Sequence, residues 1–175
     1  MDQTVSKKIK EATKTHKFKG VDFIDIFPIM ANPPILKLVI DTFAQRLATV
    51  DYDKVFMLEA RGFLFAPALS LQTGKGCYPI RKAGKLPGEC EKLSYKLEYG
   101  EDVIEIQKET ISKGDKVVLL DDVLATGGTM RATIDLIEKL GGEVVCVLLL
   151  SRIVKANGLE RLNLPKEKVF WIYDD

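Results

Sequence analysis

The chain has little of the side-chain chemistry on which many hydrolases and metalloproteins depend. Its 175 residues include one histidine, His16, and three cysteines, Cys77, Cys90 and Cys146, with no CxxC pair. A Ser-His-Asp or Cys-His mechanism would have to use His16, which lies in a lysine-rich polar segment without the partners that such a mechanism requires. The cysteines form neither a disulfide pattern nor a zinc pattern, which favours a reducing compartment, the cytoplasm.

Long apolar runs and an excess of charge of one sign are also missing. The longest purely apolar run, Val144–Leu150, is too short to span a bilayer, and the N-terminal segment lacks the apolar region of a signal peptide. The 26 basic and 25 acidic side chains give a net charge of +1, so no general attraction to nucleic acid follows. We therefore expect neither a membrane nor a nucleic acid as partner. The N-terminal lysines are interpreted as a solvated helix face: Lys7, Lys8, Lys10, Lys14, Lys17 and Lys19.

Alternating strand and helix patterns indicate an α/β protein, and the composition suits a single domain over residues 1–175. The order of elements predicts right-handed βαβ units, and hence a mostly parallel central sheet with helices on both faces. Buried strands are expected at Val55–Leu58, Cys77–Ile80, Val117–Leu120, Val144–Leu150 and, at the sheet edge, Val169–Tyr173. Helices are expected near residues 5–12 and at Ile35–Ala48, Gly62–Leu71, Thr129–Leu140 and Ile153–Leu162, with a hairpin at Leu93–Ile106 and a loop at Lys82–Gly88. Asn32 followed by two prolines marks a helix start.

The segment Val117–Thr129 carries the most specific pattern in the chain. A buried strand ends in two acids, two threonines then flank two glycines, and a helix begins. Glycines let the backbone come close to a ligand, and N–H groups at a helix N-terminus favour an anion. The segment therefore predicts a cradle for one phosphate monoester, formed by Ala125, Thr126, Gly127, Gly128 and Thr129. Neither GxxxxGK[ST] nor GxGxxG is present, so it is not a Walker loop or a dinucleotide fingerprint.

The two acids before this cradle, Asp121 and Asp122, would repel a phosphate unless they served another group. Ionised carboxylates only accept hydrogen bonds, and the 2′- and 3′-hydroxyls of a ribose donate them. The carboxyl end of a parallel strand is also where ligands bind in α/β sheets. The whole segment thus predicts a ribose 5-phosphate site, the alternative being a solvated turn with an Asp-Asp cap.

Val117–Thr129 resembles the phosphoribosyl pyrophosphate signature of the type I phosphoribosyltransferases. Three further segments resemble the adenine-specific branch of that family: Glu59–Phe63, Arg81–Gly88 and Leu97–Gly100. The resemblance covers roughly residues 20–150 and is weaker at both ends. It implies the type I fold, with residues 1–34 forming an N-terminal helix and a hood over the base, and with a mobile hairpin loop. It also implies a purine-salvage reaction, in which phosphoribosyl pyrophosphate and adenine give AMP and pyrophosphate.

A basic group is available for the pyrophosphate. Arg61 stands at a predicted helix start after a strand, and Arg81, Lys82 and Lys85 cluster in a loop after the next strand. A multiply charged anion needs such cations, and arginine offers a planar two-point contact; the alternative is a solvated basic loop. The resemblance implies that Arg61 and Lys85 bind pyrophosphate and that Arg61 assists catalysis. It further implies a homodimer, in which a basic residue, with Arg81 as the candidate, reaches across the interface.

Glu98 and Tyr99 match the family's closing loop, which implies that they are catalytic. Closure would exclude water from the reacting centre. A glutamate in this loop can exchange a proton with N7 of the purine while N9 attacks C1′. Without the resemblance, Glu98 reads as an exposed strand carboxylate, because most glutamates are exposed.

The resemblance places the base beneath Asp22, Phe23 and Ile24. Phe23 is expected to stack on the purine, although core packing is the alternative, and backbone groups of Asp22 and Ile24 would read its edge. Ile24 stands where the family commonly has an arginine, so an arginine contact from this position is not expected. Val123 and Leu124 would form the opposite apolar wall.

Mg²⁺ is the expected cofactor, held by pyrophosphate and the ribose hydroxyls with no direct protein ligand. Three other functions stay open at this point. One is a phosphoribosyltransferase for hypoxanthine, guanine, xanthine or orotate. Another is a regulator that keeps the ligand but has lost catalysis. The third is a bifunctional or structural role through the lysine-rich N-terminus, which nucleic-acid binding with a steep salt dependence would support.

Overall fold

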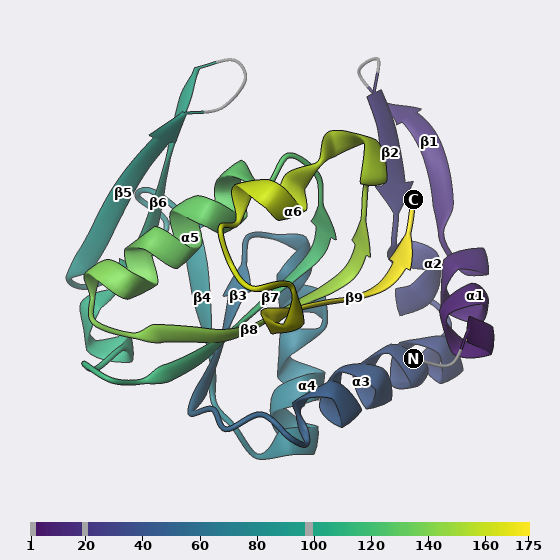
Figure 1. Cartoon of the computed structure of the whole chain (residues 1–175), viewed down its shortest axis with the longest axis horizontal. Helices are drawn as coiled ribbons and strands as arrows, with labels where there is room; N and C mark the ends of the chain where they lie inside the picture. Colours follow the sequence, from purple (N-terminus) through teal and green to yellow (C-terminus); the bar gives the residue numbers. More distant parts are fainter. Residues whose placement is uncertain (1–2, 19–20, 97–99) are drawn as a thin grey trace.

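The computed structural model describes residues 3–18, 21–96 and 100–175. A seven-stranded sheet with the order β5-β6-β4-β3-β7-β8-β9 runs through the described part of the chain (Figure 1). Five neighbouring strands are parallel: β4 (Cys77–Lys82), β3 (Lys54–Leu58), β7 (Lys116–Leu124), β8 (Glu143–Arg152) and β9 (Val169–Asp174). The hairpin of β5 (Cys90–Lys96) and β6 (Glu101–Gln107) extends this sheet antiparallel to β4. The predicted mostly parallel α/β sheet, with Val169–Tyr173 at its edge, is confirmed.

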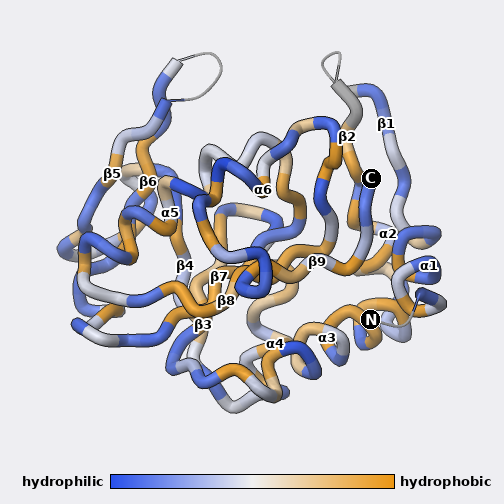
Figure 2. The backbone as a smooth tube through the Cα atoms, in the orientation of Figure 1, coloured by the Kyte–Doolittle hydropathy of each residue, from blue (hydrophilic) through white to orange (hydrophobic). Residues whose placement is uncertain are grey.

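Helices cover both faces of the sheet because its central strands are apolar on both sides. Val118 and Leu120 of β7 pack in one core with α1 (Gln3–Glu11), α3 (Pro33–Leu47) and α4 (Ala66–Thr73). Val117 and Leu119 face the other core, with α5 (Gly128–Lys139). The hydrophobic residues of these strands appear as orange stretches of the tube at the centre of Figure 2. Asn32 caps α3 by accepting a hydrogen bond from the Ile35 N–H at 3.3 Å, as the sequence predicts.

The N-terminal region contains a strand that the sequence pattern did not indicate. β1 (Lys14–Phe18) pairs antiparallel with β2 (Val21–Asp25), and the short helix α2 (Phe27–Met30) follows. Apart from Phe18, β1 reads Lys-Thr-His-Lys, with no apolar alternation to reveal a strand. The β1/β2 hairpin and the β5/β6 hairpin stand at opposite ends of the molecule, with the connection from β7 to α5 between them (Figure 1).

Three element boundaries differ from the prediction. β7 continues to Leu124 instead of ending at Leu120, because β8 runs beside it as far as Arg152. The helix expected at Gly62–Leu71 is a 3₁₀ turn, Arg61–Leu64, followed by α4, which has Pro67 in its first turn. The expected helix Ile153–Leu162 divides into a 3₁₀ turn, Val154–Ala156, and α6 (Gly158–Arg161). Further 3₁₀ turns are Lys108–Thr110 and Lys166–Lys168. Among the described residues, no helix is both long and apolar enough to cross a membrane.

Candidate functional site

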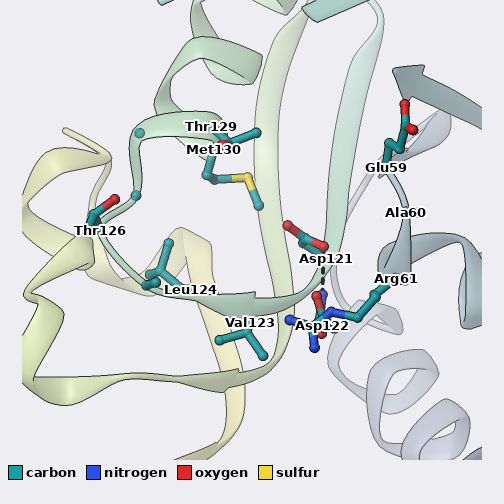
Figure 3. A pocket seen from close by; sticks show the side chains of 13 residues that line it. Glu59, Ala60, Arg61, Asp121, Asp122, Val123, Leu124, Thr126, Thr129 and Met130 are labelled. Atoms are coloured by element: carbon teal, nitrogen blue, oxygen red, sulfur yellow. Dashed lines mark hydrogen bonds and ion pairs between the residues drawn. The ribbon is translucent and has the colours of Figure 1, made fainter. Parts of the chain in front are cut away.

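A cavity of about 240 Å³ opens at the carboxyl ends of the neighbouring parallel strands β3 and β7 (Figure 3). It is lined by residues 59–61, which follow β3, and by residues 121–130, which run from the end of β7 into α5. Ligands bind at this edge in α/β sheets. The fold therefore brings the predicted phosphate cradle and Arg61 to one cavity, although some sixty residues separate them in the sequence.

The phosphate cradle is the turn between β7 and α5. Gly127 has a φ of +77°, which is the left-handed conformation that favours glycine, and it caps α5 without a side-chain hydrogen bond. The first N–H groups of α5 have no partner within the helix, so they are available to an anion in the cavity. Thr129, in the first turn of α5, has its hydroxyl oxygen 3.1 Å from the Tyr95 hydroxyl of β5. Tyr95 therefore sets where the Thr129 hydroxyl lies.

Gly158 of α6 packs against the backbone of this turn. It was not among the site residues predicted from the sequence. A Cβ atom on Gly158 would lie 2.1 Å from the carbonyl oxygen of Ala125 and 3.0 Å from the Gly127 nitrogen. A Cβ on Gly127 would in turn lie 2.6 Å from the Gly158 carbonyl oxygen. From the sequence, Gly158 is only one residue of the helix expected at Ile153–Leu162, because nothing in the local pattern shows that this segment packs on a turn thirty residues earlier.

The two acids of β7 have different partners, whereas the sequence led us to expect one shared role. The Asp122 carboxylate lies 2.7 Å from Nε of Arg61 and is almost fully buried, and Figure 3 shows Arg61 reaching across to it. Asp121 accepts a hydrogen bond from the Asp122 N–H at 2.9 Å. Burial raises the pKa of both carboxyls; the charge of Asp122 raises the pKa of Asp121 further, whereas Arg61 lowers that of Asp122. Both acids line the cavity, and within the part of the chain that the structure describes only Asp122 is paired with a cation there.

Arg61 connects the cavity to the N-terminal hairpin. Its Nη1 donates to the carbonyl of Ile24 at 2.8 Å, and its guanidinium lies 4.4 Å from the centre of the Phe23 ring. The Ile24 side chain is buried in the core, so it is the backbone of this residue that faces Arg61. Phe23 is only partly buried. The hood residues thus reach the cavity through Arg61, whereas Val123 and Leu124 line it directly.

The basic loop predicted to bind pyrophosphate is neutralised by acids of the same chain. Glu59, which lines the cavity, forms an ion pair with Lys85 and another with Arg81, whose Nε lies 3.3 Å away. It also accepts the Lys82 N–H at 2.9 Å. Burial alone would raise the pKa of Glu59, but the hydrogen bonds from Lys85, Lys82 and Arg81 outweigh burial and bring the pKa to about 2.

Of the remaining predicted residues, those that the structure describes lie on or beside the two hairpins. The Lys82 ammonium lies 2.9 Å from the Asp102 carboxylate on β6, and Asp102 is the strand partner of Tyr95. Asp22 lies in β2. Glu98 and Tyr99 lie outside the described residues, between the ends of β5 and β6.

Comparison with known proteins agrees with this geometry. The sequence matches the family model of the phosphoribosyl transferase domain over residues 28–167. Adenine phosphoribosyltransferase from Pseudothermotoga lettingae is 43% identical over 146 residues, which are 83% of this chain and 86% of that protein. The solved structure of the Rhodothermus marinus adenine phosphoribosyltransferase has a TM-score of 0.93 at 37% identity, covering 99% of this chain and 100% of that one. The Saccharomyces cerevisiae enzyme, solved with adenine and D-2,5-dideoxy-2,5-imino-altritol 1,6-bisphosphate, has a TM-score of 0.91 at 38% identity, covering 98% and 99%.

The parallel sheet and the cavity beside its β7–α5 turn define the class of protein as a phosphoribosyltransferase. Within that class, the similarity to adenine-specific enzymes extends over most of the chain in both sequence and structure. The chain belongs to the adenine phosphoribosyltransferase family.

Proposed function

We propose that this protein transfers the 5-phosphoribosyl group from phosphoribosyl pyrophosphate to adenine, giving AMP and pyrophosphate in purine salvage. The observation that carries the proposal is the cavity in which the N-terminus of α5, the acids of β7 and Arg61 converge. Similarity to enzymes named for this activity supports adenine as the base.

The 5′-phosphate binds in the turn from Ala125 to Thr129, where the N–H groups at the start of α5 favour an anion. The ribose lies against Asp121, because its carboxylate lines the cavity and accepts hydroxyl hydrogen bonds. Asp122 takes part by holding Arg61 at 2.7 Å. With the ligand bound in this way, C1′ of the sugar lies between the phosphate cradle and the basic residues.

Pyrophosphate leaves toward the basic residues, which stabilise the charge that builds on it in the transition state. Arg61 lies in the cavity, and Glu59 holds Arg81 and Lys85 beside it. Lys82 approaches from the same loop with its ammonium paired to Asp102. Before the substrate arrives, Arg61 thus lies in the cavity, and Arg81 and Lys85 are held next to it by Glu59, which lines the cavity.

Adenine occupies the space between the hood and β7. Phe23, which already packs against the guanidinium of Arg61, supplies a stacking face, and Val123 and Leu124 form the apolar wall. Backbone groups of Asp22 and Ile24 read the edge of the base. In the closed state, Glu98 exchanges a proton with N7 while N9 forms the bond to C1′, and Tyr99 helps to exclude water.

Magnesium fits this donor set as a metal carried mainly by the substrate. The cavity offers two adjacent carboxylates, and the one on Asp122 is paired with Arg61. Mg²⁺ keeps several water and phosphate ligands instead of requiring a cage of protein oxygens. Bound with pyrophosphate, it would neutralise charge on the leaving group.

A cytoplasmic homodimer is the form in which we expect the enzyme to act. Leu71 of α4 is 88% exposed and Leu64, in the turn after Arg61, is 37% exposed. We propose that a subunit interface covers these apolar side chains, and Arg81, on leaving Glu59 of its own chain, is our candidate for the residue that crosses it. Sedimentation of the purified protein should give twice the mass of the chain.

The deciding experiment incubates the protein with phosphoribosyl pyrophosphate, Mg²⁺ and one base at a time, and measures the nucleotide formed. Adenine should give AMP faster than hypoxanthine, guanine, xanthine or orotate gives its nucleotide. Faster turnover of another base would refute the adenine assignment. Ligand binding without turnover of any base would indicate a regulator that has lost catalysis.

A further inference from the structure

We propose that Glu59 is an internal substitute for pyrophosphate, which holds the pyrophosphate-binding cations when the anion is absent and competes with it for them. The inference deepens the proposed function, since it rests on the assignment of Arg81 and Lys85 to pyrophosphate. Glu59 thereby limits the affinity for pyrophosphate and speeds its release.

The contacts of Glu59 use both of its carboxylate oxygens. Oε1 pairs with the Lys85 ammonium. Oε2 lies 3.3 Å from Nε of Arg81 and accepts a hydrogen bond from the backbone N–H of Lys82 at 2.9 Å. The carboxylate side chain is only 11% exposed, whereas those of Arg81 and Lys85 are 32% and 45% exposed. The acid is therefore held between the two cations, and the cations keep a face open to solvent.

The position of Glu59 places this competition inside the site. Glu59 lines the same cavity as Arg61 and the phosphate cradle. Its pKa of about 2 means that it is ionised at neutral pH, so it acts as a fixed anion. A pyrophosphate that approaches Arg81 and Lys85 must take hydrogen bonds that the carboxylate already accepts.

The same exchange operates in reverse when the product leaves. A cation that loses its anion in a partly buried site is left unpaired, which opposes dissociation. Because Glu59 can pair again with Lys85 and Arg81, neither cation is left without an anionic partner when pyrophosphate departs. Glu59 therefore favours product release while its negative charge opposes tight binding.

Glu59→Gln tests the proposal because it removes the charge and keeps an oxygen that can accept the Lys82 N–H. We expect the Kd of inorganic pyrophosphate, measured by calorimetry at fixed Mg²⁺, to fall by about three- to tenfold. The pyrophosphate dissociation rate should fall with it. Glu91→Gln is the matched control, since Glu91 is also paired with two lysines, Lys108 and Lys139, but does not line the cavity; its Kd should equal that of the wild type.

A double-mutant cycle with Lys85→Met separates competition from a structural role. If Glu59 acts by competing for Lys85, the tightening caused by Glu59→Gln should shrink in the Lys85→Met background. Unchanged or weaker pyrophosphate binding by a Glu59→Gln protein that is folded at the temperature of the assay would overturn the inference. Should that variant fold poorly, Glu59→Ala must tighten binding instead.

The single cation variants separate this inference from the proposed function. If Lys85→Met and Arg81→Met each leave the affinity for pyrophosphate unchanged, the assignment of these cations to pyrophosphate is wrong too. If both weaken binding while Glu59→Gln does not tighten it, only the role of Glu59 is wrong.

Discussion

Gly158 provides a sharp test of whether α6 sets the shape of the phosphate cradle. A Cβ atom at this position would lie 2.1 Å from the Ala125 carbonyl oxygen, whereas ordinary contacts begin at about 3.4 Å. Gly158→Ala must therefore separate α6 and the cradle by about 1.3 Å. Both contacting groups are backbone, so no side-chain rotation relieves the clash. A misplacement of about 1 Å can cost on the order of a hundredfold in activity, and we expect the affinity for ribose 5-phosphate to fall by about 10- to 100-fold.

Calorimetry with ribose 5-phosphate and thermal unfolding together decide this prediction. The backbone of Gly158 is not in the left-handed region, so alanine fits its helical conformation and, without the clash, would stabilise α6 by about 0.5–1 kcal/mol. A Gly158→Ala protein with a raised melting temperature and normal ribose 5-phosphate binding would therefore refute the reasoning. Gly76→Ala is the control: its Cβ would meet the end of the Tyr78 side chain at 3.3 Å, beside the opposite end of the strands, and binding should not change.

Four other substitutions test separate parts of the site. The pKa of Glu59 is about 2 in the folded protein and ordinarily 4.5, so its ionised form stabilises the fold above about pH 5, and this contribution is lost as the pH falls. The difference in free energy of unfolding between wild type and Glu59→Gln should therefore shrink from about 3 kcal/mol at pH 6 to about half of that at pH 3. Tyr95→Phe removes the hydroxyl beside Thr129 and should weaken ribose 5-phosphate binding by about two- to tenfold in calorimetry. Phe23→Ala should raise the KM for adenine by about tenfold with little change in the KM for phosphoribosyl pyrophosphate, and equal changes in both constants would argue against stacking. Glu98→Gln should lower turnover at least about tenfold, and much more than it weakens phosphoribosyl pyrophosphate binding; unchanged turnover would remove Glu98 from the mechanism.

The central sheet could be predicted because its strands carry the pattern in their own residues. Val117–Leu120 and Val144–Leu150 are continuous apolar runs of the kind that parallel strands buried on both faces require, and the structure places them side by side as β7 and β8. The end of β7 could not be predicted, because its pairing beyond Leu120 depends on β8 and not on the polarity of Asp121. The polar strand β1 was missed for the same reason, since its partner β2 holds it in place.

The candidate site likewise combines residues that can be predicted from the sequence with residues that only the fold reveals. The glycines and threonines of the cradle are contiguous, so their chemistry is visible in one stretch of sequence. Gly158 and Tyr95 are separated from that stretch by about thirty residues on either side, and only the folded chain shows that they contact Ala125 and Thr129. Sequence spacing likewise could not show that Asp122 is committed to Arg61, because the two meet only where β3 and β7 pair.

These internal pairings also explain why charge counting reveals so little about the site. Each cation assigned to pyrophosphate has a carboxylate partner in the described structure: Arg61 with Asp122, Arg81 and Lys85 with Glu59, and Lys82 with Asp102. Binding of pyrophosphate is then an exchange of anions, and its free energy is the difference between two sets of ion pairs, each offset by desolvation. A chain with a net charge of +1 can therefore hold a multiply charged substrate without a basic surface. It also follows that substitution of Glu59, whose contacts pyrophosphate takes over, should change pyrophosphate affinity in the opposite direction to substitutions of Arg81 and Lys85.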